Sequence, residues 1–183
     1  GASVLHRTIE TSPIVRQHLP IVSKTFGDIA NVRIRTLGTL GGELAHGDPH
    51  SDPPPVLIGL GAKITVQSIR GERQIPASDF FTGYLETALE PDEVLKEVVI
   101  PLPDPNLRSA YMKFCPTTST DWPCLGVAAF VQENEGICHS LDIIFGSATE
   151  IPHRVKGLGE IANGHRLDDR VIEGVASHCY DQV

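Results

Sequence analysis

The segment from Leu37 to Pro55, LGTLGGELAHGDPHSDPPP, constrains the fold of this chain more than any other part of the sequence. Its glycines free the backbone for turns and for positive φ angles, whereas its prolines fix φ and remove amide donors. A regular strand cannot run through such a segment. We therefore expect a long loop here, with one helical turn at GELAHG, residues 42–47.

The sequence before this loop predicts one helix followed by one strand. Apolar side chains recur at roughly helical spacing over residues 12–31, and Ser12 followed by Pro13 is typical of an N-cap and a first turn. Gly27 would end or interrupt that helix. The next residues, VRIRTLG at 32–38, alternate apolar and basic side chains, which favours a half-exposed strand.

From Val56 onward the pattern becomes richer in strands. We expect a buried segment at 55–61, a strand at 62–69, and a turn at RGER, residues 70–73, that leads into another short strand. Residues 92–103, DEVLKEVVIPLP, alternate again and stop at two prolines.

A second group of elements follows a linker at 102–109. It comprises a strand at 109–114, a hairpin over 125–152 whose turn lies at ENEG, and helical segments around ANG, the last of them capped by Asp168 or Asp169. The predicted class is α+β, with two small domains at residues 1–104 and 105–183.

Charge and cysteine content narrow the functional classes. A formal net charge of −8 argues against nucleic acid and anionic membranes as partners, because both select a basic face. We expect no membrane insertion, since no apolar run reaches the length of a spanning segment. The four cysteines form no CxxC pair, so we interpret them as reduced, mostly buried thiols of a cytoplasmic protein.

The glycine- and proline-rich segment also carries a possible metal site. His46, Asp48, His50 and Asp52 alternate, and imidazole with carboxylate suits zinc or iron. The intervening glycine and prolines break any regular strand, so these four side chains would not share one face. We therefore predict no metal in this chain and keep a metal-binding loop as an alternative.

A site for an anionic ligand is the second possibility for this segment. The run GTLGG at 38–42 does not match the G-x-G-x-x-G of a Rossmann turn, and a Walker loop is absent from the sequence. Adjacent glycines nevertheless let backbone N–H groups approach phosphate oxygens, with Thr39 as a further donor. Asp52 could then bind sugar hydroxyls. The alternative is an ordinary glycine-rich corner between two elements.

Three motifs resemble one known family in unbroken order. Residues 29–66 resemble the second half of the flavin-binding domain in the medium subunit of molybdenum hydroxylases, the family of xanthine dehydrogenase and aerobic carbon monoxide dehydrogenase. The family pattern R-x-x-G-T-I-G-G-N-x-A-H-A-D-P-x-S-D-x-P is matched from Arg35 to Pro54. DFFTGYLETALEPDEVLKEVVIPLP resembles the next motif, and AYMKF with DWPCLGVAA resembles the start of the C-terminal flavoprotein domain.

The resemblance implies a fold and a set of cofactor contacts. The fold would be the second subdomain of a FAD-binding domain of the PCMH/vanillyl-alcohol-oxidase type, followed by a truncated carbon monoxide dehydrogenase flavoprotein C-terminal-like domain. Thr39 to Glu43 would form a FAD-contacting loop, and Lys113 would reach the flavin although a lone lysine in an apolar strand ordinarily extends to the surface. The implied FAD contacts are Ile29, Ala30, Thr39, Leu40, Gly41, Gly42, Glu43, Asp52, Leu95 and Lys113.

The resemblance also implies cofactors and partners. The chain would bind FAD and pass electrons from 2Fe–2S clusters of a small subunit to an acceptor such as NAD, O₂ or a quinone, while a large subunit holds molybdopterin. No residue of this chain is expected to act as a general acid or base. No iron–sulfur cluster is expected in this chain, which has no cysteine before Cys115.

Two departures from the family pattern keep an alternative open. Glu43 stands where the family usually has Asn, and the family's first FAD subdomain, expected before residue 1, is missing from this sequence. A flavin-free scaffold subunit is therefore the second hypothesis.

Overall fold

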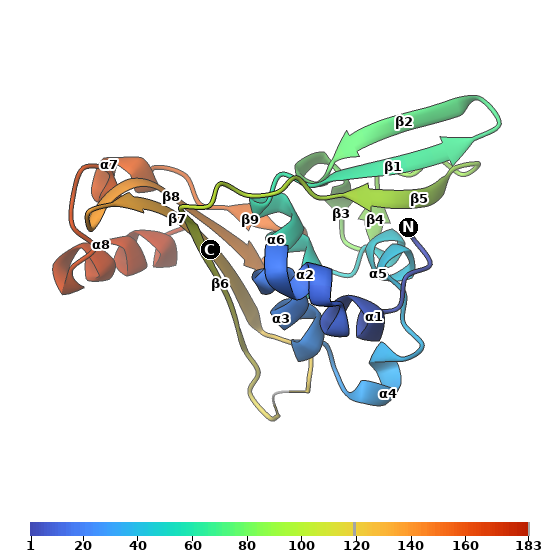
Figure 1. Cartoon of the computed structure of the whole chain (residues 1–183), viewed down its shortest axis with the longest axis horizontal. Helices are drawn as coiled ribbons and strands as arrows, with labels where there is room; N and C mark the ends of the chain where they lie inside the picture. Colours follow the sequence, from blue (N-terminus) through green and yellow to red (C-terminus); the bar gives the residue numbers. More distant parts are fainter. Residues whose placement is uncertain (119, 183) are drawn as a thin grey trace.

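The computed structural model describes residues 1–118 and 120–182. Six short helices come first, namely α1 (His6–Thr11), α2 (Pro13–His18), α3 (Pro20–Asp28), α4 (Val32–Arg35), α5 (Leu40–His46) and α6 (Pro53–Gly59). They lie beside a projecting sheet of strands β1, β2 and β5, while the C-terminal elements form a separate layer on the other side of the molecule (Figure 1). No helix in the described part of the chain is long and apolar enough to cross a membrane.

The helix predicted over residues 12–31 is divided in two. Ser12 caps α2 as expected, because its side chain accepts a hydrogen bond from the N–H of Val15, and Pro13 opens the first turn. Pro20 then disfavours helical geometry at Leu19, whose φ of −138° and ψ of 57° separate α2 from α3. Gly27 does not end the second helix, which continues to Asp28.

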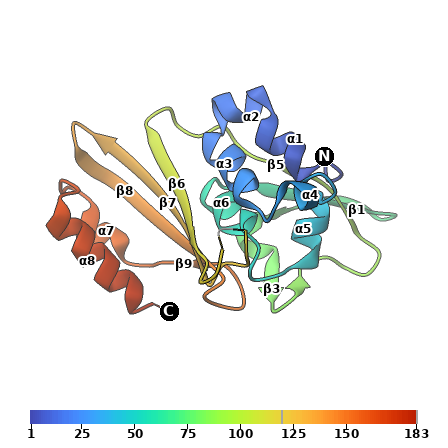
Figure 2. The same cartoon turned by 90° about the horizontal axis from the view of Figure 1, so that it is seen from below.

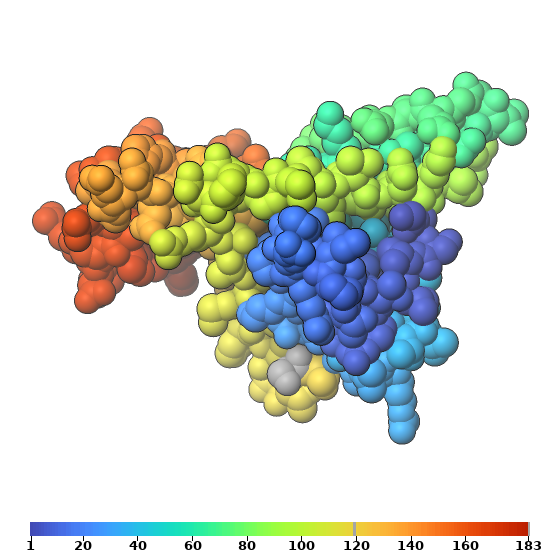
Figure 3. Space-filling view, in the orientation of Figure 1, coloured from blue at the N-terminus to red at the C-terminus, as the bar shows by residue number. Residues whose placement is uncertain are grey.

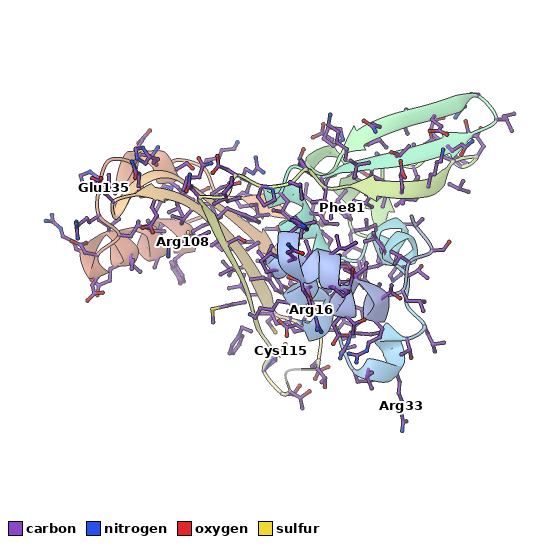
Figure 4. The ribbon with its side chains drawn as sticks, viewed as in Figure 1. Arg16, Arg33, Phe81, Arg108, Cys115 and Glu135 are labelled. Carbon is purple, nitrogen blue, oxygen red and sulfur yellow. The ribbon has the colours of Figure 1, made fainter. Side chains whose placement is uncertain are left out.

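The strand predicted at residues 32–38 is wrong, since α4 occupies this region. The Asn31 side chain accepts hydrogen bonds from the N–H groups of Arg33 and Ile34 and starts a helical turn. Val32 and Ile34 are both half exposed, so their alternation with the arginines marks no buried face. Arg33 projects away from the body of the molecule (Figure 4).

The loop segment contains the predicted helical turn and one helix that the sequence did not predict. Helix α5 covers the GELAHG turn and ends at Gly47, whose φ of 66° suits glycine. Helix α6 lies within the segment taken for the start of a strand-rich region, and it begins with three consecutive prolines. Proline is tolerated in the first helical turn, where the N–H groups need no intrahelical partner.

The projecting sheet contains the predicted strands, but the turn between the first two lies at residues 69–70 rather than 70–73, and residues 71–73 belong to the second strand. It has the antiparallel order β2-β1-β5, formed by β2 (Gly71–Pro76), β1 (Lys63–Ser68) and β5 (Val94–Val99). The 3₁₀ turn η1 (Ala77–Asp79) and the small pair β3 (Phe81–Gly83) and β4 (Glu86–Thr87) lie between β2 and β5 in the chain.

The C-terminal sheet has the order β6-β7-β8-β9. Its strands are β6 (Leu107–Phe114), β7 (Leu125–Asn134), β8 (Ile137–Gly146) and β9 (His153–Arg154), and α7 (Leu158–Ala162) and α8 (Asp169–Tyr180) follow. The β7–β8 turn falls at the predicted ENEG, where Glu135 and Gly136 both have positive φ. Asp168 caps α8 by accepting from the N–H of Val171.

This sheet packs on both faces (Figure 2). One face contributes Tyr111, Phe130 and Ile144 to the hydrophobic core of the N-terminal helices and β1. The other face, with Ile143 and Phe145, packs under α7 and α8. Gly59 admits the Phe130 ring, because a Cβ at that position would lie 1.9 Å from Phe130 Cε2. One core therefore extends across residue 104, and the division into domains at that residue stays a prediction.

The cysteines are all free thiols, but they are less buried than expected. Cys138 and Cys179 are buried, Cys115 is half buried at the end of β6, and Cys124 is exposed.

Candidate functional site

A cavity of about 250 Å³ lies where the N-terminal helices meet the segment that joins β6 to β7. The segment (yellow) lies against the N-terminal helices (blue) in Figure 3. The cavity brings together five of the ten predicted cofactor contacts, from four separate parts of the chain. Its lining consists of Ile29, Ala30, Ile34, Glu43, His50, Asp52, Lys113, Thr120, Asp121, Trp122 and Pro123.

Ile29 and Ala30 form an apolar wall of the cavity in a constrained turn. Ala30 has a φ of 39°, a region that non-glycine residues occupy rarely. The Arg35 guanidinium holds this turn, since its Nη1 donates to the carbonyl oxygens of Ile29 at 2.7 Å and Ala30 at 3.1 Å. Such strain persists only where the surroundings impose it, and it concentrates at functional sites.

A buried polar cluster contributes Asp52 and Lys113 to the lining of the cavity. Lys113 Nζ lies 2.9 Å from Asp52 Oδ2, and the two side chains are 8 % and 6 % exposed. The hydroxyl of Tyr111 donates to Asp52 Oδ1 at 2.6 Å. Tyr111 and Lys113 alternate along β6 and thus share one face of the strand, which positions both against the residue that precedes α6.

Burial dominates the ionisation of this cluster. Loss of solvent raises the pKa of the Asp52 carboxyl, although the hydrogen bonds from Tyr111 and Lys113 act in the opposite direction. Burial and the Asp52 charge together raise the pKa of Tyr111 far above its usual value, so the phenol remains a donor. A carboxyl that is perturbed by desolvation and a charged partner beside a cavity indicates a functional site.

The glycine run does not present free amide donors. The N–H of Leu40 donates to Val4 O at 3.0 Å, that of Gly41 to Ala2 O at 2.8 Å, and that of Gly42 to Thr39 Oγ1 at 3.1 Å. Gly41 is needed for packing, because a Cβ there would lie 2.6 Å from the Ala2 Cβ.

Gly42 differs from Gly41. It is exposed, and an added Cβ would meet only Thr39 Oγ1 within 4 Å. The backbone at this position is therefore open to a ligand, whereas the first amides of α5 are bonded within the chain.

Glu43 faces the cavity one residue further along α5. Its Oε1 accepts a hydrogen bond from the Ser51 hydroxyl, and its Oε2 lies 3.8 Å from His6 Nε2. His6 is 1 % exposed and belongs to α1. Two side chains that the sequence did not predict thus surround the Glu43 carboxylate.

Leu95 lies outside the cavity. It sits on β5 opposite Val66 and packs against the N-terminal core. Its predicted position beside the flavin stays a prediction.

The proposed metal ligands do not converge. His50 Nδ1 lies 3.1 Å from one Asp48 oxygen and His46 Nε2 lies 3.8 Å from the other, whereas Asp52 faces Tyr111 and Lys113. Within residues 1–118 and 120–182, no group of three or more His, Cys, Asp or Glu side chains could hold a metal ion. The metal-binding alternative therefore lacks a ligand set.

Sequence reasoning missed Tyr111 and Trp122 as parts of the site. Tyr111 could have been found from its spacing, since it lies two residues before Lys113 in a predicted strand. Trp122 reaches the cavity from the β6–β7 segment and contacts His50 edge to face, with ring centroids 6.0 Å apart. No local pattern pairs these two residues.

Comparison with known proteins places the chain in a family. Residues 1–103 match the model described as the FAD binding domain in molybdopterin dehydrogenase, so the chain belongs to this family. The nicotine 6-hydroxylase medium subunit of Paenarthrobacter nicotinovorans is 36 % identical over 96 % of this chain and 61 % of its own length. Caffeine dehydrogenase subunit beta of Pseudomonas sp. is 31 % identical over 98 % of this chain and 61 % of its length.

Solved structures agree with this assignment. Quinoline 2-oxidoreductase from Pseudomonas putida 86 has a chain that is 31 % identical, with a TM-score of 0.92, over 97 % of this chain and 61 % of that one. Carbon monoxide dehydrogenase from Hydrogenophaga pseudoflava gives 28 % identity and a TM-score of 0.91 over 97 % of this chain and 62 % of that one. The resemblance and the mixed helix-and-sheet fold are thus confirmed. The chain spans about 61 % of the relatives it matches.

The cavity residues fit part of a FAD molecule. An apolar wall faced by a few fixed polar groups is typical of cofactor sites, but about 250 Å³ is less than the roughly 300–1,000 Å³ of whole ligand pockets. The open backbone at Gly42 suits close approach of a ligand. The bonded amides of residues 40–42 do not make a phosphate cradle, so the diphosphate is not assigned to them.

Proposed function

We propose that this chain is part of the FAD-binding medium subunit of a molybdenum hydroxylase. The observation that carries the proposal is the cavity that gathers Ile29, Ala30, Glu43, Asp52 and Lys113 in a chain of the FAD-binding family. When bound, FAD would supply the electron-transfer chemistry, from 2Fe–2S clusters of a small partner subunit to an external acceptor such as NAD, O₂ or a quinone.

The residues of this chain bind and orient the cofactor in this proposal. Ile29 and Ala30 offer an apolar surface, and the Asp52–Lys113 pair and Glu43 offer fixed polar atoms. Thr39, Leu40, Gly41 and Gly42 form the contacting loop, with Gly42 as the point of closest approach. Water is excluded at the side where Tyr111 and Asp52 are buried.

The partner subunits and the cellular location of this protein are inferred from the same family. Molybdopterin and the clusters would lie in a large and a small subunit, as the resemblance implies, and the assembled enzyme would be cytoplasmic. One of the relatives, from Paenarthrobacter nicotinovorans, is named as a subunit of the 6-hydroxypseudooxynicotine dehydrogenase complex, which supports an assembly of several chains.

The test is the visible absorption spectrum of the complete subunit. A flavin spectrum, with FAD released on denaturation, is expected. The Gly42→Val variant should lose its FAD, because a β-branched side chain blocks the backbone. Its Cβ would lie 2.9 Å from Thr39 Oγ1, so the Thr39 side chain must shift, and circular dichroism of the variant checks that the fold survives. Gly174→Val is the matched control at another helical glycine, far from the cavity in α8, where an added Cβ would meet only Ile161 Cγ2 at 3.5 Å.

A flavin-free scaffold is the second candidate. It is favoured by the amides of residues 40–42, which are already bonded within the chain, and by the negative charge of Glu43 beside them. This alternative predicts a folded, colourless complete subunit. Equal FAD content in wild type and Gly42→Val would remove the loop from the proposed site.

A further inference from the structure

His6 is a buried polar side chain that its neighbours leave unsatisfied. It is 1 % exposed, and within the described ranges neither Nδ1 nor Nε2 has a hydrogen-bond partner. An imidazole carries at least one N–H in every protonation state, and an unpaired donor inside a protein is rare. An apolar residue at this buried position would leave no unpaired donor, so the presence of a histidine calls for an explanation.

The surroundings hold the imidazole in one orientation. Its ring packs against Phe26 edge to face, with centroids 5.3 Å apart. Gly38 leaves room for it, because a Cβ there would lie 3.0 Å from His6 Cε1. The backbone N–H of His6 also donates to the carbonyl of Gly38 at 3.0 Å. The ring is thus fixed between Phe26 of α3 and Gly38, the residue before the N-cap of α5.

In this orientation Nε2 faces Glu43. The Nε2–Oε2 separation of 3.8 Å is about 1 Å longer than a hydrogen bond between nitrogen and a carboxylate. The other oxygen of the carboxylate, Oε1, already accepts from the Ser51 hydroxyl. The Glu43 carboxylate therefore lies at the wall of the cavity, with Oε1 bonded to Ser51 and Oε2 facing His6. A small movement of either side chain would bring His6 Nε2 within hydrogen-bond distance of Oε2.

We propose that His6 is a positioning residue for the cofactor site, whose Nε2–H donates to Glu43 Oε2 when the cavity is filled. With Ser51 and His6 on its two oxygens, the carboxylate points in one direction and accepts hydrogen bonds from hydroxyl or N–H groups of the flavin cofactor. This inference rests on the proposed function, because the orientation of Glu43 matters to binding only if the cofactor occupies the cavity.

The test measures the dissociation constant of FAD for the complete subunit, by flavin fluorescence after the cofactor has been removed. His6→Leu removes both ring nitrogens and should raise the Kd about tenfold, the usual effect of one hydrogen bond to a charged group. His6→Gln returns an N–H close to the place of Nε2 and should restore most of the affinity. His18→Leu, at an exposed histidine, is the matched control and should leave the Kd unchanged.

A double-mutant cycle separates positioning from folding. In a Glu43→Ala background, His6→Leu should change the Kd less than twofold, because the acceptor group that it positions is gone. A tenfold loss in both backgrounds, or a lowered Tm of the FAD-free protein with an unchanged Kd, would overturn the positioning role. A wild-type complete subunit that binds no FAD would overturn the proposed function itself, and that failure is seen without any variant.

Discussion

Two carboxylates in this molecule each contact a cation, yet their pKa values move in opposite directions. Asp52 lies 2.9 Å from Lys113, and its pKa is raised. Glu93 lies 2.7 Å from Arg73, and the hydrogen bonds from that guanidinium, with one from the Glu90 N–H, hold its pKa at about 2. Distance to the cation does not explain the difference.

Depth explains it. Lys113 is 8 % exposed, so both members of its pair have left water. The Glu93 side chain is itself only 5 % exposed, but its partner Arg73 is 44 % exposed. Desolvation therefore exceeds the attraction in the first pair and not in the second. A chain that keeps a costly buried pair beside a cavity has a candidate functional site at that place.

The largest expected effect comes from breaking the buried pair. Lys113→Met leaves the Asp52 carboxylate without its cation and should lower the free energy of unfolding by about 3 kcal/mol at neutral pH. Urea unfolding followed by circular dichroism measures it. Lys63→Met, at an exposed lysine on β1, is the control and should stay within about 0.5 kcal/mol of wild type.

The double variant Asp52→Asn/Lys113→Met sharpens this result. It buries no charge, so it should recover a large part of the loss. If Lys113→Met costs no more than Lys63→Met, the pair is not desolvated and the comparison with Glu93 fails.

Tyr111→Phe should have an intermediate effect. It removes the O–H that donates to Asp52 Oδ1 at 2.6 Å but preserves the packing of the ring in the core. We expect a loss of about 1–2 kcal/mol by the same urea measurement. Tyr84→Phe, at an exposed tyrosine, should be neutral, and an equal effect of both variants would contradict the role of the hydroxyl.

The free energy of unfolding should depend on pH through both Asp52 and Glu93, with opposite signs. Because the folded-state pKa of Asp52 lies above its ordinary value of 3.8, the folded protein binds the extra proton, and stability falls as pH rises from 3.8 through the raised pKa. Asp52→Asn removes this slope. Urea unfolding of both proteins between pH 3 and 8 measures it, and a slope that persists in the variant would contradict the assignment.

The smallest effect on stability is expected from the ion pair of Glu93 and Arg73 at the surface. The stability that Glu93 contributes is present above its ordinary pKa of 4.5 and is lost as pH falls from 4.5 towards 2. In Arg73→Gln, the Glu93 pKa should return towards 4.5, as an NMR titration of its side chain would show. Lys96→Gln is the control, because Lys96 bonds Glu72 instead.

Local signals in the sequence predicted much of the fold. Three local signals set the backbone conformation at their own positions, and all three predictions were confirmed. They are the helix caps Ser12 and Asp168 and the turn at Glu135 and Gly136. Helix α4 was not predictable from apolar spacing, since one side chain, Asn31, starts it. The three prolines that open α6 predict a loop when only the local sequence is considered. The residues after them are buried against β7 and β8, a tertiary contact that local sequence does not reveal.

The site was predictable only in part, because its residues come from separate elements. Asp52 was named from the chemistry of the glycine-rich segment and Lys113 from the family resemblance, and the structure joins them. His6 and Ser51 carried no such signal, since their importance depends on where Glu43 lies in space. The glycine run predicted backbone N–H groups free to meet an anion, and it gave no sign that Ala2 and Val4 accept two of these amides.

The sheet shared by two cores has a consequence for biosynthesis. Phe130 and Ile144 belong to the core that Ile9 and Phe26 begin, yet they leave the ribosome long after those residues. A nascent chain that reaches only β5 still carries an empty slot beside Gly59, where the Phe130 ring belongs. The core of the first half of this protein is therefore completed only when β7 and β8 have been made, and until then part of its apolar surface stays uncovered.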